Sequence, residues 1–82
     1  MIKYPVNKFH NLEFEQYNTN KIDRYFNVYL SGRSIKREMI AEIKINLSDK
    51  KKSIKKIKKI GHIIHPMALL ALDKFMNNYK DD

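Results

Sequence analysis

Three stretches of the chain alternate apolar and polar side chains, which is the pattern of a β-strand with one buried face. Residues 12–17 alternate around Phe14, and residues 24–30 place Phe26 and Val28 on one side. Residues 35–47 carry an odd-numbered apolar series, formed by Ile35, Met39, Ala41, Ile43, Ile45 and Leu47. The pattern therefore predicts three strands.

Short turn segments separate these stretches, namely residues 18–20, which are rich in asparagine, and the pair Ser31-Gly32. Short connections join antiparallel neighbours, so we expect a three-stranded antiparallel meander over residues 12–47. The even-numbered apolar series of the second strand must then meet the odd-numbered series of the third on one face. Residues 1–11 contain Pro5 and two asparagines and are predicted to form an irregular arm.

The apolar period changes to that of a helix after residue 47. At about 100° per residue, a series of isoleucines falls on one side of a helix and most of the lysines fall on the other. Ser48 suits the N-cap of this helix, and Gly61 suits a left-handed C-cap. The sequence thus predicts a lysine-rich amphipathic helix over residues 48–60. Its apolar side would be formed by Ile54, Ile57, Ile60 and Ile64.

A second helical pattern covers residues 66–79, where Pro66 suits the first helical position. Its apolar stripe contains Leu72 and Phe75, which we expect to face the sheet. The predicted fold is a single α+β domain over residues 1–82, with a three-stranded antiparallel meander packed against one or two C-terminal helices. The complete stripe consists of Ala68, Leu69, Leu72, Phe75, Met76 and Tyr79.

The net charge of +8 is concentrated in one part of the 82-residue chain. Residues 48–65 contain seven lysines and one aspartate, whereas the rest of the chain is nearly balanced. A local excess of this kind attracts phosphates or acidic proteins. The chain contains no cysteine, no long apolar run and no apolar N-terminal segment. We therefore expect a cytoplasmic protein with no disulfide, no thiolate metal site and no membrane partner.

The chain contains 14 lysines, 11 isoleucines and 8 asparagines, and A/T-rich codons encode all three residue types. This usage favours an AT-rich genome, such as that of a low-GC bacterium or its phage or plasmid. Codon bias explains part of the lysine content. It does not explain why the lysines gather in one segment.

The lysine-rich segment is the leading candidate for a binding site. Lysine acts as a point charge suited to phosphate contact, and it reads bases poorly. We therefore expect it to bind the nucleic-acid backbone with low sequence specificity, alone or within a nucleoprotein complex. The alternative is an inhibitor or adaptor, for example an anti-defence protein, that docks on an acidic surface of a host protein. The candidate residues are Lys51, Lys52, Lys55, Lys56, Lys58 and Lys59.

The outward face of the predicted sheet would carry Tyr25, Tyr29 and Ile40, with Tyr17 as a possible addition. Aromatic side chains on an exposed sheet can stack on single-stranded bases. Four glutamates share or border this face and would repel phosphates: Glu13, Glu15, Glu38 and Glu42. We therefore predict a protein-contact face.

No sequence motif indicates an enzyme, a cofactor or a metal site. There is no glycine-rich phosphate loop and no nucleophile elbow. His62 and His65 lie three residues apart, but no cysteine or nearby carboxylate completes a ligand set. We expect a protein without catalytic activity, and a toxin-like ribonuclease is the third hypothesis. It would draw on these histidines together with Arg33, Arg37 and Tyr29.

Overall fold

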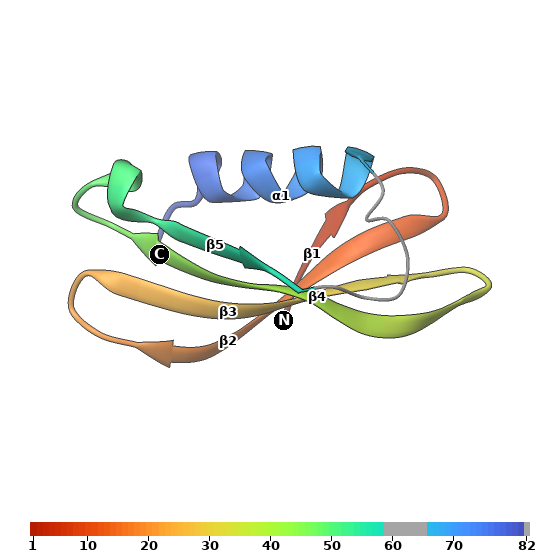
Figure 1. The fold of residues 1–82 in the computed structure, drawn as a ribbon, viewed down its shortest axis with the longest axis horizontal. Coiled ribbons are helices and arrows are strands. Elements are labelled where there is room, and N and C mark those ends of the chain that lie inside the picture. The colour runs from red at the N-terminus through yellow and green to blue at the C-terminus, as the bar shows by residue number, and fades with distance from the viewer. Residues whose placement is uncertain (59–65, 82) are drawn as a thin grey trace.

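The computed structural model describes residues 1–58 and 66–81 of the chain. It is an α+β fold in which a five-stranded antiparallel sheet carries one C-terminal helix on one face (Figure 1). The strands follow one another across the sheet in the order β1-β2-β3-β4-β5. The elements are β1 Ile2–Pro5, β2 His10–Thr19, β3 Asp23–Gly32, β4 Ile35–Asn46, the 3-10 turn η1 Lys50–Lys52, β5 Ile54–Ile57 and α1 Pro66–Asn78.

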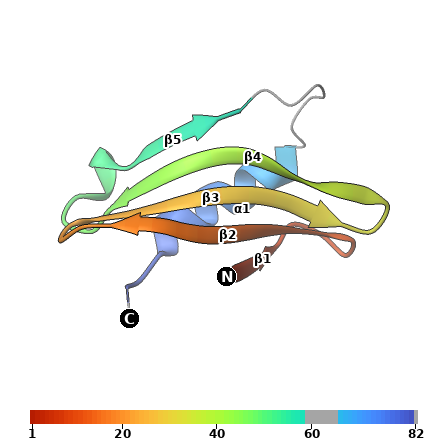
Figure 2. The same cartoon turned by 90° about the horizontal axis from the view of Figure 1, so that it is seen from below.

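The three predicted strands correspond to β2, β3 and β4, and the structure adds one strand at each edge of the sheet. Figure 2 shows the five strands from the side opposite α1, with β5 and β1 at the two edges. We call this uncovered side the outer face. No element of residues 1–58 or 66–81 lies over it.

Strand β1 replaces the predicted irregular arm. The Asn7 side chain accepts hydrogen bonds from the backbone amides of Phe9 and His10, at 2.8 and 2.9 Å. This turn folds the chain back, so that Ile2 pairs with Phe14 and Pro5 pairs with Asn11. Proline is tolerated here because β1 is an edge strand that pairs on one side only.

The predicted helix over residues 48–60 is wrong for residues 48–58, the part of it that the structure describes. Asp49, rather than Ser48, caps the short turn η1 by accepting a hydrogen bond from the Lys51 amide at 3.0 Å. The chain then forms β5, which pairs with residues 41–44 of β4. Like-charged lysines three or four residues apart disfavour a helix, and β-branched isoleucine favours a strand. The proposed cap Gly61 lies outside the described residues.

Ile40 was predicted to lie on the outer face, and this prediction is wrong because a β-bulge in β4 turns its side chain to the core. Val28 pairs with Ala41, but the next pair is Tyr29 with Met39, so Ile40 is an extra residue in β4. Its side chain is fully buried in the core under α1 instead of lying on the outer face. Tyr25 and Tyr29 alternate with the buried Phe26 and Val28, which places both tyrosines on the outer face.

Helix α1 covers the apolar face of the sheet through an aromatic cluster. As predicted, Leu72 and Phe75 are buried, together with Ala68 and Ala71. The Phe75 ring stacks on Phe14 with 3.6 Å between ring centroids, and it meets Phe26 edge-on at 5.6 Å. The helix ends at Asn78, one residue before the predicted end.

A lysine of the basic run holds the C-terminal end of α1. Lys50 Nζ donates hydrogen bonds to the carbonyl oxygens of Met76 and Tyr79, at 3.4 and 3.1 Å. The last turn of a helix leaves carbonyl groups without helical partners and carries partial negative charge. Lys50 therefore fixes η1 against the helix, and its role is structural.

Replacing Gly32 with alanine is expected to destabilise the fold. An added Cβ would collide with the carbonyl oxygen of Phe9 and approach the His10 ring to 2.9 Å. That carbonyl cannot easily move, because it accepts a hydrogen bond from Arg33. Gly32→Ala should cost about 1–3 kcal/mol of unfolding free energy, measured by urea denaturation.

The neighbouring Ser34 provides a control of opposite sign. It is the one described residue other than glycine with a positive φ, 66°. Glycine adopts this conformation without steric cost, so Ser34→Gly should leave stability unchanged or raise it. Equal stabilities for the Gly32→Ala variant and the unmodified chain would contradict the close approach at Gly32.

Candidate binding surface

The outer face is built in rows, because side chains of directly paired residues point to the same side of a sheet. In one row, Lys44 of β4 lies between Tyr25 of β3 and Ile54 of β5. In the next row, Glu42 pairs with Lys56. Aromatic, cationic and anionic side chains from three strands are thus neighbours in two adjacent rows of the outer face.

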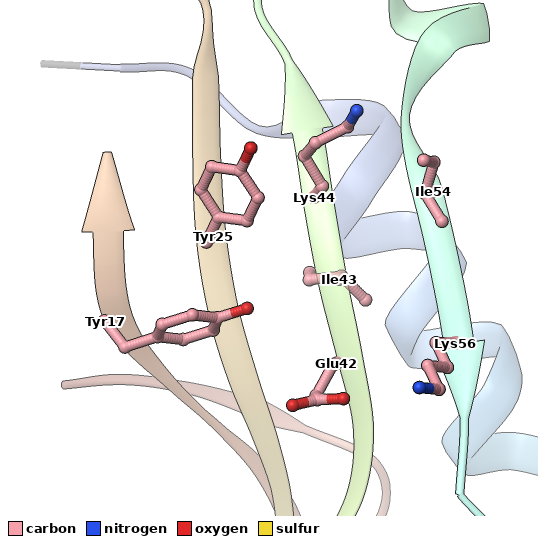
Figure 3. A pocket seen from close by; sticks show the side chains of 7 residues that line it. All are labelled: Tyr17, Tyr25, Glu42, Ile43, Lys44, Ile54 and Lys56. Carbon is pink, nitrogen blue, oxygen red and sulfur yellow. The ribbon is translucent and has the colours of Figure 1, made fainter. Parts of the chain in front are cut away.

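A hollow of about 320 Å³ opens on this part of the outer face (Figure 3). Its two tyrosines come from neighbouring strands, and their ring centroids are 6.0 Å apart with a tilt of 53°. The volume is at the lower end of the range typical of small-molecule sites, roughly 300–1,000 Å³. The lining residues are Tyr17, Tyr25, Glu42, Ile43, Lys44, Ile54 and Lys56.

Tyr17 lies on the outer face by the alternation of β2, at a local irregularity in the pairing with β3. The pairing with β3 shifts between Gln16 and Asn18, which makes Tyr17 the extra residue of a bulge. The ring of Tyr17 lies beside Tyr25 and remains half exposed, at 51%. An incoming flat group can therefore contact it.

The part of the outer face next to the hollow is neutralised internally. Arg37 Nε donates a hydrogen bond to the Glu13 carboxylate at 2.8 Å, and the guanidinium lies 3.7 Å from the centre of the Tyr29 ring. The pKa of Glu13 is lowered, first by a hydrogen bond from the Ser31 side chain and then by the one from Arg37. Glu13 and Tyr29 are thus engaged with Arg37 rather than free to bind a partner.

The predicted basic surface is divided among different sides of the molecule. Strand geometry sends Lys55 toward α1, where its Nζ forms an ion pair with Asp73 at 2.7 Å. Lys56 points to the outer face and lines the hollow. Lys58 approaches Glu42 to 3.8 Å. Lys59 lies outside the described residues.

The two remaining predicted lysines lie in η1. Lys51 and Lys52 are exposed there, on the α1 side of the sheet (Figure 1). The five described lysines of the predicted cationic face therefore do not share one face of the structure. Of the described ones, only Lys56 borders the hollow.

Four lining residues of the hollow were absent from the predicted binding site: Glu42, Ile43, Lys44 and Ile54. Ile43 was predicted to face the core, and it is buried there. Lys44 and Glu42 could have been found, because the alternation in residues 35–47 already places them on the polar face. Ile54 could not, because it was assigned to the apolar side of a helix. Its side chain is 55% exposed at the sheet edge.

The histidines give no site in the described part of the chain. His62 and His65 fall outside it, and the ring of His10 lies 3.0 Å from the Asn7 side-chain oxygen. Among residues 1–58 and 66–81, no group of three or more histidine, cysteine, aspartate or glutamate side chains is placed to hold a metal ion. The described helix is too short to cross a membrane.

Comparison with known proteins assigns no family to the chain. No protein-family model, no curated protein and no solved structure matches it.

Proposed function

We propose that the outer face binds single-stranded nucleic acid, with bases on Tyr17 and Tyr25 and phosphates beside Lys44 and Lys56. The observation that supports this proposal is the hollow itself, where two neighbouring aromatic rings of β2 and β3 lie beside two lysines of β4 and β5 on an uncovered sheet face. Proteins that bind single strands combine such stacking surfaces with a cationic path for the backbone.

The arrangement favours a single strand over a duplex. Bases in a duplex are stacked on each other, so the faces of Tyr17 and Tyr25 could not reach them. In a single strand, each base stacked on an aromatic ring contributes about 1–3 kcal/mol, with little dependence on sequence. The net charge of +8 adds long-range attraction to the phosphates.

The proposal is one of binding without catalysis. A ribonuclease that uses Arg37 and Tyr29 is less favoured. The Arg37 guanidinium lies over the Tyr29 ring and donates a hydrogen bond to Glu13, so neither side chain is free to act on RNA. Labelled RNA incubated with the protein should be recovered intact, and His62→Ala or His65→Ala should change nothing. Turnover lost in either histidine variant would instead support the ribonuclease hypothesis.

Changing Lys44 and Lys56 together to glutamine should weaken the salt dependence of binding. For single strands, each phosphate contact contributes roughly 0.7 to the slope of log affinity against log salt. The double variant should therefore flatten that slope by about 1.4. Fluorescence anisotropy of a labelled oligonucleotide across a salt series provides the measurement.

Lys8 and Lys36 supply a control with the same loss of charge. Lys36 lies on β4 about 27 Å along the strand from Lys44, toward the opposite end of the sheet. Lys8 is exposed in the turn between β1 and β2. Changing both to glutamine should leave the slope nearly unchanged. If the two double variants reduce the slope equally, phosphate contact at the hollow is excluded.

A second candidate function is binding of an acidic protein, such as the host target of an inhibitor from a phage or other mobile element. It is favoured by β5, an edge strand whose Ile54 and Ile57 are 55% and 38% exposed beside Lys56. An affinity pull-down with and without nuclease separates the candidates. A partner retained after nuclease treatment would favour the protein interface.

A further inference from the structure

We infer that Glu42 selects the base held in the hollow, and that the selected base is guanine. This inference rests on the proposed binding of single-stranded nucleic acid. It concerns the feature that fits that proposal least well, which is a carboxylate that shares the hollow with two lysines in a site for a polyanion. Phosphate is repelled by a carboxylate, whereas the donor edge of a base is attracted to one.

The acceptor atoms of Glu42 are available to a ligand. In residues 1–58 and 66–81, its nearest cation is Lys58 Nζ at 3.8 Å, which is longer than a hydrogen bond. The side chain of Glu42 is 33% exposed to solvent. Glu13, another carboxylate of the outer face, is only 10% exposed and already accepts a hydrogen bond from Arg37. These two glutamates thus differ in their capacity to bind.

The chemistry of the bases then favours guanine. An ionised carboxylate only accepts hydrogen bonds, and two parallel donors satisfy it best. Guanine presents two adjacent donors, N1–H and the 2-amino group, on its Watson–Crick edge. Adenine and cytosine each place an acceptor beside one amino group, and uracil places its N3–H between two carbonyl oxygens. Single strands leave these edges accessible.

The spacing of the side chains allows one base to use both contacts. Tyr25 pairs with Lys44, which makes Glu42 its diagonal neighbour across the two strands. Diagonal neighbours are roughly 7–8 Å apart, a distance that aromatic and long side chains span. In Figure 3, Glu42 lies between the two tyrosines on one side and Lys56 on the other. A base stacked on the tyrosines can therefore turn its edge toward Glu42 and its phosphates toward the lysines.

The test is fluorescence anisotropy with oligouridines that carry one central guanine, adenine, cytosine, uracil or hypoxanthine. Hypoxanthine is guanine without the 2-amino group, so it removes one of the two donors. We expect about five- to tenfold tighter binding of the guanine oligonucleotide than of any other, the low end of the discrimination typical of a bidentate contact. Glu42→Gln should abolish this preference while leaving affinity for the other oligonucleotides equal or higher.

Glu15→Gln is the matched control, because Glu15 shares the outer face in the row of Glu42 but does not line the hollow. It should keep the guanine preference. Equal affinity for all five oligonucleotides, or a guanine preference that survives Glu42→Gln, would overturn the inference and leave the proposed function standing. Binding of none of them would overturn both.

Discussion

Replacing Phe75 with alanine is expected to lower the free energy of unfolding by about 3–5 kcal/mol. Phe75 is 7% exposed and joins α1 to the sheet through its stacked contact with Phe14 and its edge contact with Phe26. Its removal leaves a cavity at the centre of this cluster. A small domain has only about 5–15 kcal/mol of stability, so this loss is a large fraction of the total and should clearly lower the urea midpoint of unfolding.

Leu70→Ala is the control for this experiment. Leu70 belongs to the same helix but is 60% exposed, so its truncation should change stability by no more than about 0.5 kcal/mol. Urea denaturation followed by circular dichroism measures both variants. Similar midpoints for Phe75→Ala and Leu70→Ala would show that α1 does not pack on the sheet through Phe75.

The double variant Tyr17→Ala, Tyr25→Ala should bind single-stranded nucleic acid at least about 30-fold more weakly than the unmodified protein. Two stacked bases contribute roughly 2–6 kcal/mol together, and each 1.4 kcal/mol corresponds to a factor of ten. Neither tyrosine belongs to the buried core, so the fold should persist. Anisotropy with a short oligouridine measures the loss.

Phenylalanine at both positions separates stacking from hydrogen bonding by the tyrosine hydroxyls. Tyr17→Phe, Tyr25→Phe retains both rings and should retain most of the affinity. Circular dichroism shows whether each variant is folded. A folded alanine variant that binds as tightly as the unmodified protein would eliminate base stacking as the basis of the proposed function.

The sequence was sufficient to predict which residues of β3 and of the Ala41–Ile45 part of β4 face the core. It was not sufficient on the other side of Ile40, where Met39 pairs with the outer-face Tyr29 and Ile35 is 39% exposed. The apolar residues are even-numbered in the second predicted strand and odd-numbered in the third, so an even-numbered residue had to pair with an odd-numbered one for both to face the core. Phe26 does pair with Ile43, and Val28 does pair with Ala41. The argument works because a strand has a side-chain period of two, and a one-residue slip would expose the whole apolar series.

The same argument failed at the bulge in β4, because nothing in a single sequence marks an inserted residue. Ile40 interrupts the alternation of β4, and the parity rule therefore placed it on the outer face. Tyr17 is the corresponding residue of β2, but there the alternation and the structure agree, because Tyr17 was expected beside Tyr25 and lies there. The bulge in β4 thus removed a predicted site residue, and the bulge in β2 removed none.

The prediction for the lysine-rich segment was wrong for a different reason. Ile54 and Ile57 are three residues apart, which fits one face of a helix and equally fits a four-residue strand. In the strand they point to opposite faces, and so do Lys55 and Lys56. The tertiary context decides, because β4 offers a free edge that β5 completes. A local pattern this short does not contain that information.

The strand order has a consequence for how the chain folds as it is synthesised. Every strand pairs with the one made just before it, so the sheet can form hairpin by hairpin. Helix α1 arrives last, and until it does the apolar face of β2, β3 and β4 stays uncovered. A nascent chain halted before Pro66 would be prone to aggregation or chaperone capture. Completion of the helix is thus the step that commits the sheet to its native state.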